Sequence, residues 1–248
     1  MERMPIMMLE LHNIFAGYGK VEVLRSLSIH VNSEEKVGLF GPNGHGKTTL
    51  LRTISGLIKP KSGDITFQGK SLIRMSPQQI VEHGIIHIPQ GNILFPRMTV
   101  TENLTLGAYS KRGWDNRAEN LQKVFDLFPR LRERRDQLAL TLSGGERQML
   151  SIGVGLMGVP SLLLLDEPSL GLAPKVKDEL AETIAEIGQS GVTMIIVDQD
   201  IELLLNLCTR LYLIEKGRVS LETQDNKSIQ QREILDMYFG NVTRWRSI

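Results

Sequence analysis

The most chemically suggestive part of the sequence is a glycine-rich segment of eight residues. It reads Gly41-Pro42-Asn43-Gly44-His45-Gly46-Lys47-Thr48 and stands between a predicted strand, 37–40, and a predicted helix, 47–55. Glycines let backbone N–H groups converge on phosphate oxygens, and the N-terminus of the following helix adds a favourable dipole. In such a loop the lysine reaches the β and γ phosphates, and the threonine hydroxyl ligates Mg²⁺. A fortuitous glycine-rich turn is the alternative, which the flanking strand and helix disfavour.

Two adjacent carboxylates, Asp166 and Glu167, end an apolar run of four leucines. This is the arrangement expected of an aspartate that organises Mg²⁺ beside a residue that orients or deprotonates water. Neighbouring side chains on a strand point to opposite faces, so we expect the two acids to take different roles because the backbone turns at Pro168. A charged strand end that faces solvent is the alternative, which the phosphate loop makes less attractive.

The elements that must position these groups alternate along the chain. Apolar patterns predict strands at 8–14, 27–31, 37–40, 63–69, 84–89, 161–166, 192–197, 211–214 and 218–222, and helices at 47–55, 145–158, 174–187 and 200–208. Between about 99 and 136 the pattern is helical, and Thr99 with Glu102 resembles a capping box. Alternation of strand and helix predicts an α/β fold with a largely parallel sheet covered on both faces, and an antiparallel β element at the N-terminus.

Composition restricts the class of protein. The 248 residues are 41% hydrophobic and 23% charged, and 29 basic against 28 acidic residues give a net charge of +1. No global basic field is present, so we expect no nucleic acid partner. Cys208 has no second cysteine to pair with, and no apolar stretch approaches the ~20 residues that cross a bilayer. We therefore expect a cytosolic protein that other subunits would have to hold at a membrane.

A phosphate loop and an acidic strand end also fit kinases, helicases and GTPases, but a third motif narrows the choice. Leu142-Ser143-Gly144-Gly145-Glu146-Arg147-Gln148 resembles the signature motif of the ABC (ATP-binding cassette) family and stands just upstream of the acidic strand. Ser143 is a good N-cap, and the two glycines leave N–H groups free at the start of the next helix. The motif therefore predicts a second anion site without a lysine. A simple helix cap would explain the serine but not the glycines.

This resemblance implies a P-loop NTPase fold of ABC type and an ATPase activity with ATP and Mg²⁺. It implies one domain, 8–248, with a RecA-like core and antiparallel β element at 8–98 and 159–222, a helical signature subdomain at 99–158 and a C-terminal helical tail at 223–248. Two ATPase subunits would pair head to tail, in a homodimer or heterodimer, so that each signature motif contacts the γ phosphate of the ATP held by the other subunit.

The resemblance also assigns roles to single residues. Tyr18 matches the aromatic residue that stacks on adenine, Gln90 the glutamine that touches Mg²⁺ and the attacking water, and Glu167 the general base. A tyrosine of the core or of a turn, and a generic polar loop residue, are the alternatives for the first two. The implied catalytic residues are Glu167, Gln90, Gln199 and Lys47, and the implied Mg²⁺ ligands are Thr48, Gln90 and Asp166. The implied nucleotide-binding residues are Tyr18, Gly41, Pro42, Asn43, Gly44, His45, Gly46, Lys47, Thr48, Thr49, Ser143, Gly144, Gly145 and Glu146.

The sequence most resembles one branch of the family, the ATPases of importers for branched-chain amino acids and similar hydrophobic or amide substrates. Ala173 stands where most ABC ATPases have an aspartate, and Gln199 where most have a histidine that contacts the γ phosphate. A neutral glutamine stabilises a phosphoryl transition state less than a protonated imidazole would. The resemblance implies two transmembrane permease subunits, an external substrate-binding protein acting through them, and a peripheral location on the cytoplasmic face of the membrane. An export or lipid-extraction ATPase and a soluble, non-transport ABC ATPase remain alternatives.

Three features depart from the branch or lack a role. His45 replaces a small residue in the phosphate loop, where it would either donate a hydrogen bond across the dimer interface or be a tolerated solvent-facing substitution. Val154-Gly155 replaces a usual Arg-Ala pair. Residues 130–135 form an arginine-rich cluster that we interpret as a solvated face. Histidine and cysteine spacing predicts no metal other than Mg²⁺.

Overall fold

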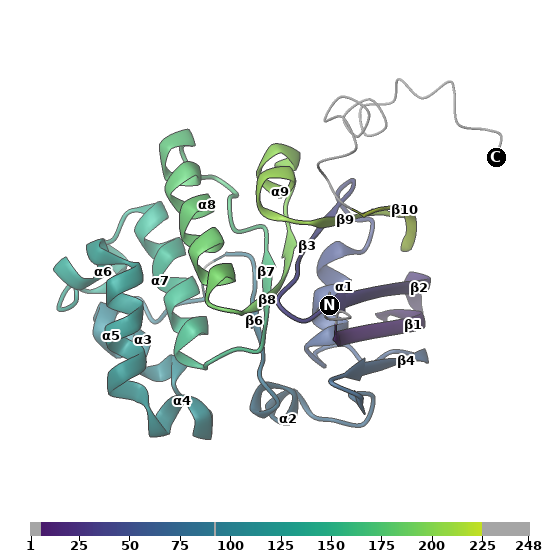
Figure 1. Ribbon diagram of the computed structural model, residues 1–248, viewed down its shortest axis with the longest axis horizontal. Helices are drawn as coiled ribbons and strands as arrows, with labels where there is room; N and C mark the ends of the chain where they lie inside the picture. Colours follow the sequence, from purple (N-terminus) through teal and green to yellow (C-terminus); the bar gives the residue numbers. More distant parts are fainter. Residues whose placement is uncertain (1–5, 92, 225–248) are drawn as a thin grey trace, which may run out of the picture.

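The computed structural model describes residues 6–91 and 93–224, which fold around a six-stranded sheet (Figure 1). The strand order is β10-β9-β3-β8-β7-β6, and every pairing is parallel except that of β9 with β10. The strands are β3 (Lys36–Phe40), β6 (Ile85–Ile88), β7 (Leu162–Asp166), β8 (Thr193–Val197), β9 (Arg210–Glu215) and β10 (Arg218–Gln224). The predicted α/β fold with a mostly parallel sheet is confirmed.

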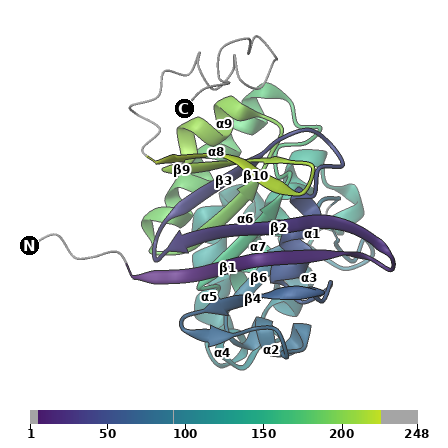
Figure 2. The ribbon, with the colours of Figure 1, turned by 90° about the vertical axis from the view of Figure 1, so that its right-hand side faces the viewer.

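A second, antiparallel sheet is built from the N-terminal part of the chain, as predicted. Its order is β2-β1-β4-β5, with β1 (Met7–Tyr18), β2 (Val21–Asn32), β4 (Ser62–Phe67) and β5 (Lys70–Ser71). The first two strands are longer than the alternation of apolar residues predicted. Register shifts interrupt their pairing at four places, and each shift breaks the alternation of side chains along the strand. Figure 2 shows this sheet face on, with α1 (Lys47–Ile54) behind it.

The core sheet separates two hydrophobic clusters. Leu162 and Leu164 of β7 face the cluster that contains α1 and the antiparallel strands. Leu163 and Leu165 face the other cluster, which the remaining large helices cover. Because both faces of a parallel sheet are buried, the central strands are apolar throughout rather than alternating.

Five helices gather on one side of the core sheet, away from the antiparallel sheet (Figure 1). They are α3 (Val100–Gly107), α4 (Lys111–Asp115), α5 (Arg117–Leu127), α6 (Pro129–Glu133) and α7 (Gly144–Met157). The predicted capping box of Thr99 and Glu102 begins α3. The other helical elements are α2 (Pro77–Glu82), η1 (Ala139–Thr141), α8 (Pro174–Gln189) and α9 (Ile201–Leu207). Within the described residues no helix combines the length and the apolar character needed to cross a membrane.

The predicted C-terminal helical tail, 223–248, begins differently from the prediction. Its first two residues belong to β10, because β9 and β10 pair as far as Gln224 with Arg210. The rest of that segment lies outside the described residues.

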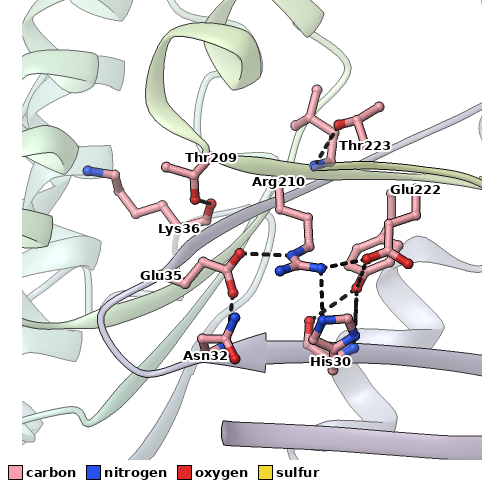
Figure 3. Close-up of polar contacts among 10 residues, drawn as sticks. His30, Asn32, Glu35, Lys36, Thr209, Arg210, Glu222 and Thr223 are labelled. Atoms are coloured by element: carbon pink, nitrogen blue, oxygen red, sulfur yellow. Dashed lines mark hydrogen bonds and ion pairs between the residues drawn. The ribbon is translucent and has the colours of Figure 1, made fainter. Parts of the chain in front are cut away.

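A polar cluster joins the two sheets where β2 passes β9 and β10 (Figure 3). Arg210 donates to Glu35 at 2.8 Å, to Glu222 at 2.5 Å and to Nε2 of His30 at 2.8 Å. The hydroxyl of Tyr212 donates to the carbonyl of His30 at 3.2 Å. The guanidinium is buried and compensated by two carboxylates, so the cluster fastens the antiparallel sheet to the core sheet.

Candidate active site

The site lies where β3, β6, β7 and β8 end, because the carboxyl ends of parallel strands share one edge of a sheet. The phosphate loop follows β3 and leads into α1. Gln90 follows β6, Glu167 follows β7 and Gln199 follows β8. Groups that are far apart in the sequence therefore meet at this edge.

The phosphate loop has a conformation that its glycines permit. Gly41, Gly44 and Gly46 have φ angles of 139°, 78° and 109°. A Cβ on Gly41 would lie 2.2 Å from the carbonyl oxygen of Ile214, so no other residue fits there. The ammonium of Lys47 is buried and donates to the carbonyls of Gly41 at 2.6 Å and Pro42 at 3.1 Å. Burial lowers the pKa of Lys47, although the charges of Glu167 and Asp166 oppose the shift.

Asp166 and Thr48 form an oxygen pair at the start of α1. The hydroxyl of Thr48 donates to Oδ1 of Asp166 at 3.1 Å. Oδ2 of Asp166 is buried and has no hydrogen-bond partner within the described residues. Burial raises the pKa of this carboxyl, and the hydrogen bond from Thr48 opposes the shift. A buried carboxylate oxygen without a partner, beside a hydroxyl, suits a hard cation such as Mg²⁺, which takes oxygen ligands.

Glu167 is held by two amide side chains. Gln90 Nε2 donates to Oε2 at 3.0 Å, and Gln199 Nε2 lies 3.0 Å from both carboxylate oxygens. The backbone N–H of Glu167 donates to the carbonyl of Val197 in β8 at 2.7 Å. These contacts bring together three residues that the resemblance had placed in one site.

The chain turns at Pro168 as predicted, within a turn closed by the N–H of Leu170 donating to the carbonyl of Glu167 at 3.2 Å, but the change of direction already begins at Glu167. Glu167 has a φ of 50°, in the left-handed region, where a non-glycine residue costs roughly 1 kcal/mol or more. The hydrogen bond to Val197 compensates for part of this cost. The turn gives Asp166 and Glu167 different surroundings, since Asp166 is buried and Glu167 is only partly buried.

Asp198 is a buried carboxylate that sequence reasoning did not single out. Its oxygens accept hydrogen bonds from the N–H of Ser169 at 3.1 Å, the hydroxyl of Ser169 at 2.8 Å and the N–H of Asp200 at 2.9 Å. Burial raises its pKa. Asp198 thereby ties the segment after Glu167 to the segment that carries Gln199. An apolar strand that ends in an acid, as β7 also does, was the available signal.

Tyr18 and His45 have partners in their own chain. Tyr18 ends β1, is half exposed, and its hydroxyl accepts a hydrogen bond from Arg52 of α1 at 3.0 Å. His45 is half-buried, and its Nδ1 accepts from the N–H of Lys216 at 3.3 Å. The imidazole is therefore attached to the β9–β10 turn and is not a simple solvent-facing substitution. A hydrogen bond from His45 across a dimer interface stays a prediction, which would have to use Nε2.

The signature motif begins α7 with a complete capping box. The hydroxyl of Ser143 accepts from the N–H of Glu146 at 3.3 Å, and a carboxylate oxygen of Glu146 accepts from the N–H of Ser143 at 2.8 Å. A Cβ on Gly145 would lie 2.5 Å from a methyl group of Val176, whereas Gly144 faces open space. Among the described residues no hydrogen bond or ion pair joins this motif to the phosphate loop, so one chain carries two separate parts of the predicted site.

Gly155 explains one departure from the family pattern. A Cβ at this position would lie 2.7 Å from Cδ1 of Ile88 in β6. The glycine therefore lets α7 approach the sheet closely, which is a packing role. Nothing in the structure explains the preceding Val154.

Comparisons with known proteins agree with this geometry. The family described as ABC transporter matches residues 24–170. The high-affinity branched-chain amino acid transport ATP-binding protein BraG of Pseudomonas aeruginosa is 40% identical over 233 residues, covering 94% of this chain and 100% of BraG. The lipopolysaccharide export system ATP-binding protein LptB of Haemophilus influenzae is 30% identical, covering 92% of this chain and 95% of LptB.

A solved structure gives the same result for the fold. The ADP conformation of MJ1267, an ATP-binding cassette of an ABC transporter, matches with a TM-score of 0.84 at 27% identity, covering 95% of this chain and 99% of MJ1267. The chain therefore belongs to the ABC transporter family. It binds ATP and is an ATPase.

Proposed function

We propose that this chain is the ATPase subunit of an importer for branched-chain or other hydrophobic amino acids or amides. The similarity to BraG over its whole length supports this substrate class. The absence of an aspartate at Ala173 and the glutamine at Gln199 support the same branch. Export is the second candidate, favoured by the similarity to LptB.

The observation that carries the catalytic assignment is the pair of amides on Glu167. In this proposal Glu167 is the general base or water-orienting residue, and Gln90 and Gln199 fix its carboxylate by hydrogen bonds of 3.0 Å. Lys47 would bind the β and γ phosphates. Thr48, Asp166 and Gln90 would hold Mg²⁺, which when bound neutralises phosphate charge.

The rest of the proposed nucleotide site is shared between two subunits. Tyr18 would stack on adenine, residues 41–49 would hold the triphosphate, and Ser143–Glu146 of a partner subunit would complete the site around the γ phosphate. Two ATPase subunits would therefore pair head to tail. We also propose the division into a core at 8–98 and 159–222 and a helical signature subdomain at 99–158.

The proposed docking site for a permease subunit lies between Gln90 and the helical subdomain and includes Phe95, Pro96 and Met98. Ile93 and Phe95 are exposed although they are apolar. The segment that carries the exposed Leu138 and Leu140 runs beside residues 96–99, because the N–H of Leu140 donates to the carbonyl of Pro96. Exposed apolar side chains gathered in one place are typical of protein interaction sites. Docking there would keep the chain peripheral, on the cytoplasmic face of the membrane.

The catalytic proposal is tested by Glu167→Gln. We expect this variant to bind ATP and to hydrolyse it roughly 10²- to 10⁴-fold more slowly, as for loss of a general base. Glu202→Gln, an exposed glutamate in the first turn of α9, is the matched control with unchanged turnover. Wild-type turnover in Glu167→Gln would overturn the assignment.

The transport proposal is tested by purification from cells and by reconstitution with the membrane proteins that co-purify. A pair of permeases with a substrate-binding protein, and ATPase activity stimulated by branched-chain amino acids or amides, would support import. Stimulation by lipid without a binding protein would support export instead. Co-purification with ribosomes or nucleic acid would contradict transport.

A further inference from the structure

The arginine-rich cluster at 130–135 reaches the signature motif. Its members have different partners: Arg132 pairs with Asp126, and Arg135 pairs with its neighbour Asp136 at 3.3 Å. Arg134 instead crosses to α7, where its Nε lies 2.7 Å from Oε1 of Glu146. Of the ion pairs in the described part of the chain, this one alone involves a residue of the signature motif.

Glu146 occupies a position with two opposite effects. It is the third residue of α7, where its Oε2 accepts the N–H of Ser143 and completes the capping box. A carboxylate in the first turn stabilises a helix. The same negative charge repels any anion that approaches the N–H groups of that turn. A helix start that must receive a triphosphate therefore needs this charge to be compensated.

Glu146 is ionised at neutral pH and shielded from solvent. Its side chain is 11% exposed. Burial alone would raise its pKa, but the hydrogen bonds from Ser143 and the charges of Arg134 and Arg130 hold the pKa below its usual value. Water can screen such a side chain only in part, so the compensation must come from the protein.

Arg134 is held where it compensates that charge. It caps the C-terminus of α6, and its Nη1 donates to Oε1 of Gln137 at 3.2 Å, while its Nε contacts Glu146. The side chain is thus anchored on one side by the loop before the motif and on the other by the motif. Arg132 has the same charge in the same cluster but no contact with Glu146.

We propose that Arg134 is a positioning residue of the composite ATP site: its guanidinium neutralises Glu146, so that the start of α7 accepts the γ phosphate of an ATP held by a second copy of this subunit. This inference rests on the proposed head-to-tail pairing. It gives a role to a cluster that the sequence alone presented as a solvated face.

The test measures ATP-driven association in the hydrolysis-deficient Glu167→Gln protein by analytical ultracentrifugation at increasing ATP concentration. We expect Arg134→Ala to raise the half-maximal ATP concentration about tenfold, the order expected for one uncompensated charge in a partly buried site. The shift should shrink at high salt, because ions partly screen the charge of Glu146 that the loss of Arg134 leaves uncompensated. Arg132→Ala removes an equal charge from the same cluster and should leave the midpoint unchanged.

A double-mutant cycle separates charge from structure. In a Glu146→Gln background the capping box is retained, because glutamine also accepts the N–H of residue 143. Removing Arg134 in that background should change the midpoint less than twofold. An equal loss in both backgrounds would overturn the proposal, and so would equal effects of Arg132→Ala and Arg134→Ala. If Arg134→Ala fails to fold, Arg134→Lys provides the test, because it keeps the charge and should have the ATP midpoint of the wild type. A tenfold increase of the midpoint in Arg134→Lys would contradict charge compensation.

A separate variant distinguishes this inference from the proposed pairing. Gly144→Asp places a carboxylate in open space at the start of α7, so it should abolish ATP-driven association if the motif contacts the partner's ATP. Association that survives Gly144→Asp would refute the pairing itself. Loss of association in Gly144→Asp together with an unaffected Arg134→Ala would refute only the role of Arg134.

Discussion

The hydrogen bonds between Asp198 and Ser169 hold together the two loops that carry Glu167 and Gln199, and their removal has a predictable cost. Both residues are 2% exposed. A hydrogen bond to a charged acceptor contributes about 1.5–3 kcal/mol, so Ser169→Ala, which deletes the 2.8 Å contact, should lower the free energy of unfolding by about 2 kcal/mol.

Asp198→Asn should cost a similar amount or more. An amide has one acceptor oxygen, whereas the carboxylate uses both oxygens to accept three donors. One N–H, that of Ser169, would then face another donor and lose its partner, which costs about 1–3 kcal/mol. Two hydrogen bonds join these residues, and Asp198→Asn also weakens the one that Ser169→Ala removes, so the double variant should cost about 1–2 kcal/mol less than the sum of the single variants.

Urea unfolding followed by circular dichroism measures these free energies, and steady-state ATPase assays measure the consequence for the site. We expect kcat to fall about tenfold with little change in KM for ATP, because the contact orients Glu167 and Gln199 and not the phosphate loop. Asp198→Glu, which keeps the charge, tests whether the position of the carboxylate matters as well as its presence.

The chain contains a matched control. Asp64 accepts from the hydroxyl of Ser71 at 2.8 Å and from the N–H of Ile65 at 2.9 Å, but Asp64 is only partly buried, Ser71 is exposed, and both belong to the antiparallel sheet. Asp64→Asn and Ser71→Ala should each cost less than about 1 kcal/mol. If substitutions in the buried pair cost no more than those in this less buried pair, or if the two substitutions in the buried pair were strictly additive, the reasoning would be refuted.

Two other predictions concern stability. Burial lowers the pKa of His87 to about 4, so between pH 6.5 and 4 the unfolded chain binds a proton that the folded chain excludes. The free energy of unfolding of the wild type should therefore fall by up to about 3 kcal/mol over this range. His87→Asn should remove this slope in urea titrations at several pH values, and an identical slope in both proteins would contradict it. Arg210→Met leaves Glu35 and Glu222 without their cation and should lower the free energy of unfolding by about 3–5 kcal/mol at pH 7. A decrease of less than about 1 kcal/mol would show that the polar cluster between the sheets is dispensable.

The features of the fold and of the site that the sequence could predict are those whose conformation is determined by residues adjacent in the chain. The phosphate loop and the signature motif are continuous segments whose glycines and caps determine local conformation, so their place before α1 and α7 followed directly. The core strands were predictable because an apolar run of four or five residues, bounded by turn residues, has the length of a buried strand and is shorter than a typical helix. The long strands β1 and β2 were predicted too short, since their register shifts come from pairing with each other.

Other features could not be predicted because they depend on contacts between distant segments. The left-handed turn at Glu167 is supported by Val197 in another strand. The contact of Arg52 with Tyr18 joins residues 34 positions apart, and that of His45 with Lys216 joins residues 171 positions apart. No local pattern carries such information. The short helix α2 was missed because six residues show too little periodicity, and α4 and α6 were not separated from their neighbours within the helical region predicted at about 99–136.

The four leucines of β7 have a consequence for the evolution of this strand. Since leucine faces both hydrophobic clusters, a gene carrying one additional leucine codon there would still encode an apolar strand on either face. The same insertion would move Asp166 along the sheet by about 3.3 Å and turn its carboxylate to the opposite face, away from Thr48. On that face the carboxylate would lie among the apolar side chains of the other cluster, where an unpaired charge is costly. The length of this strand is therefore constrained by the position of Asp166, in activity and in stability together.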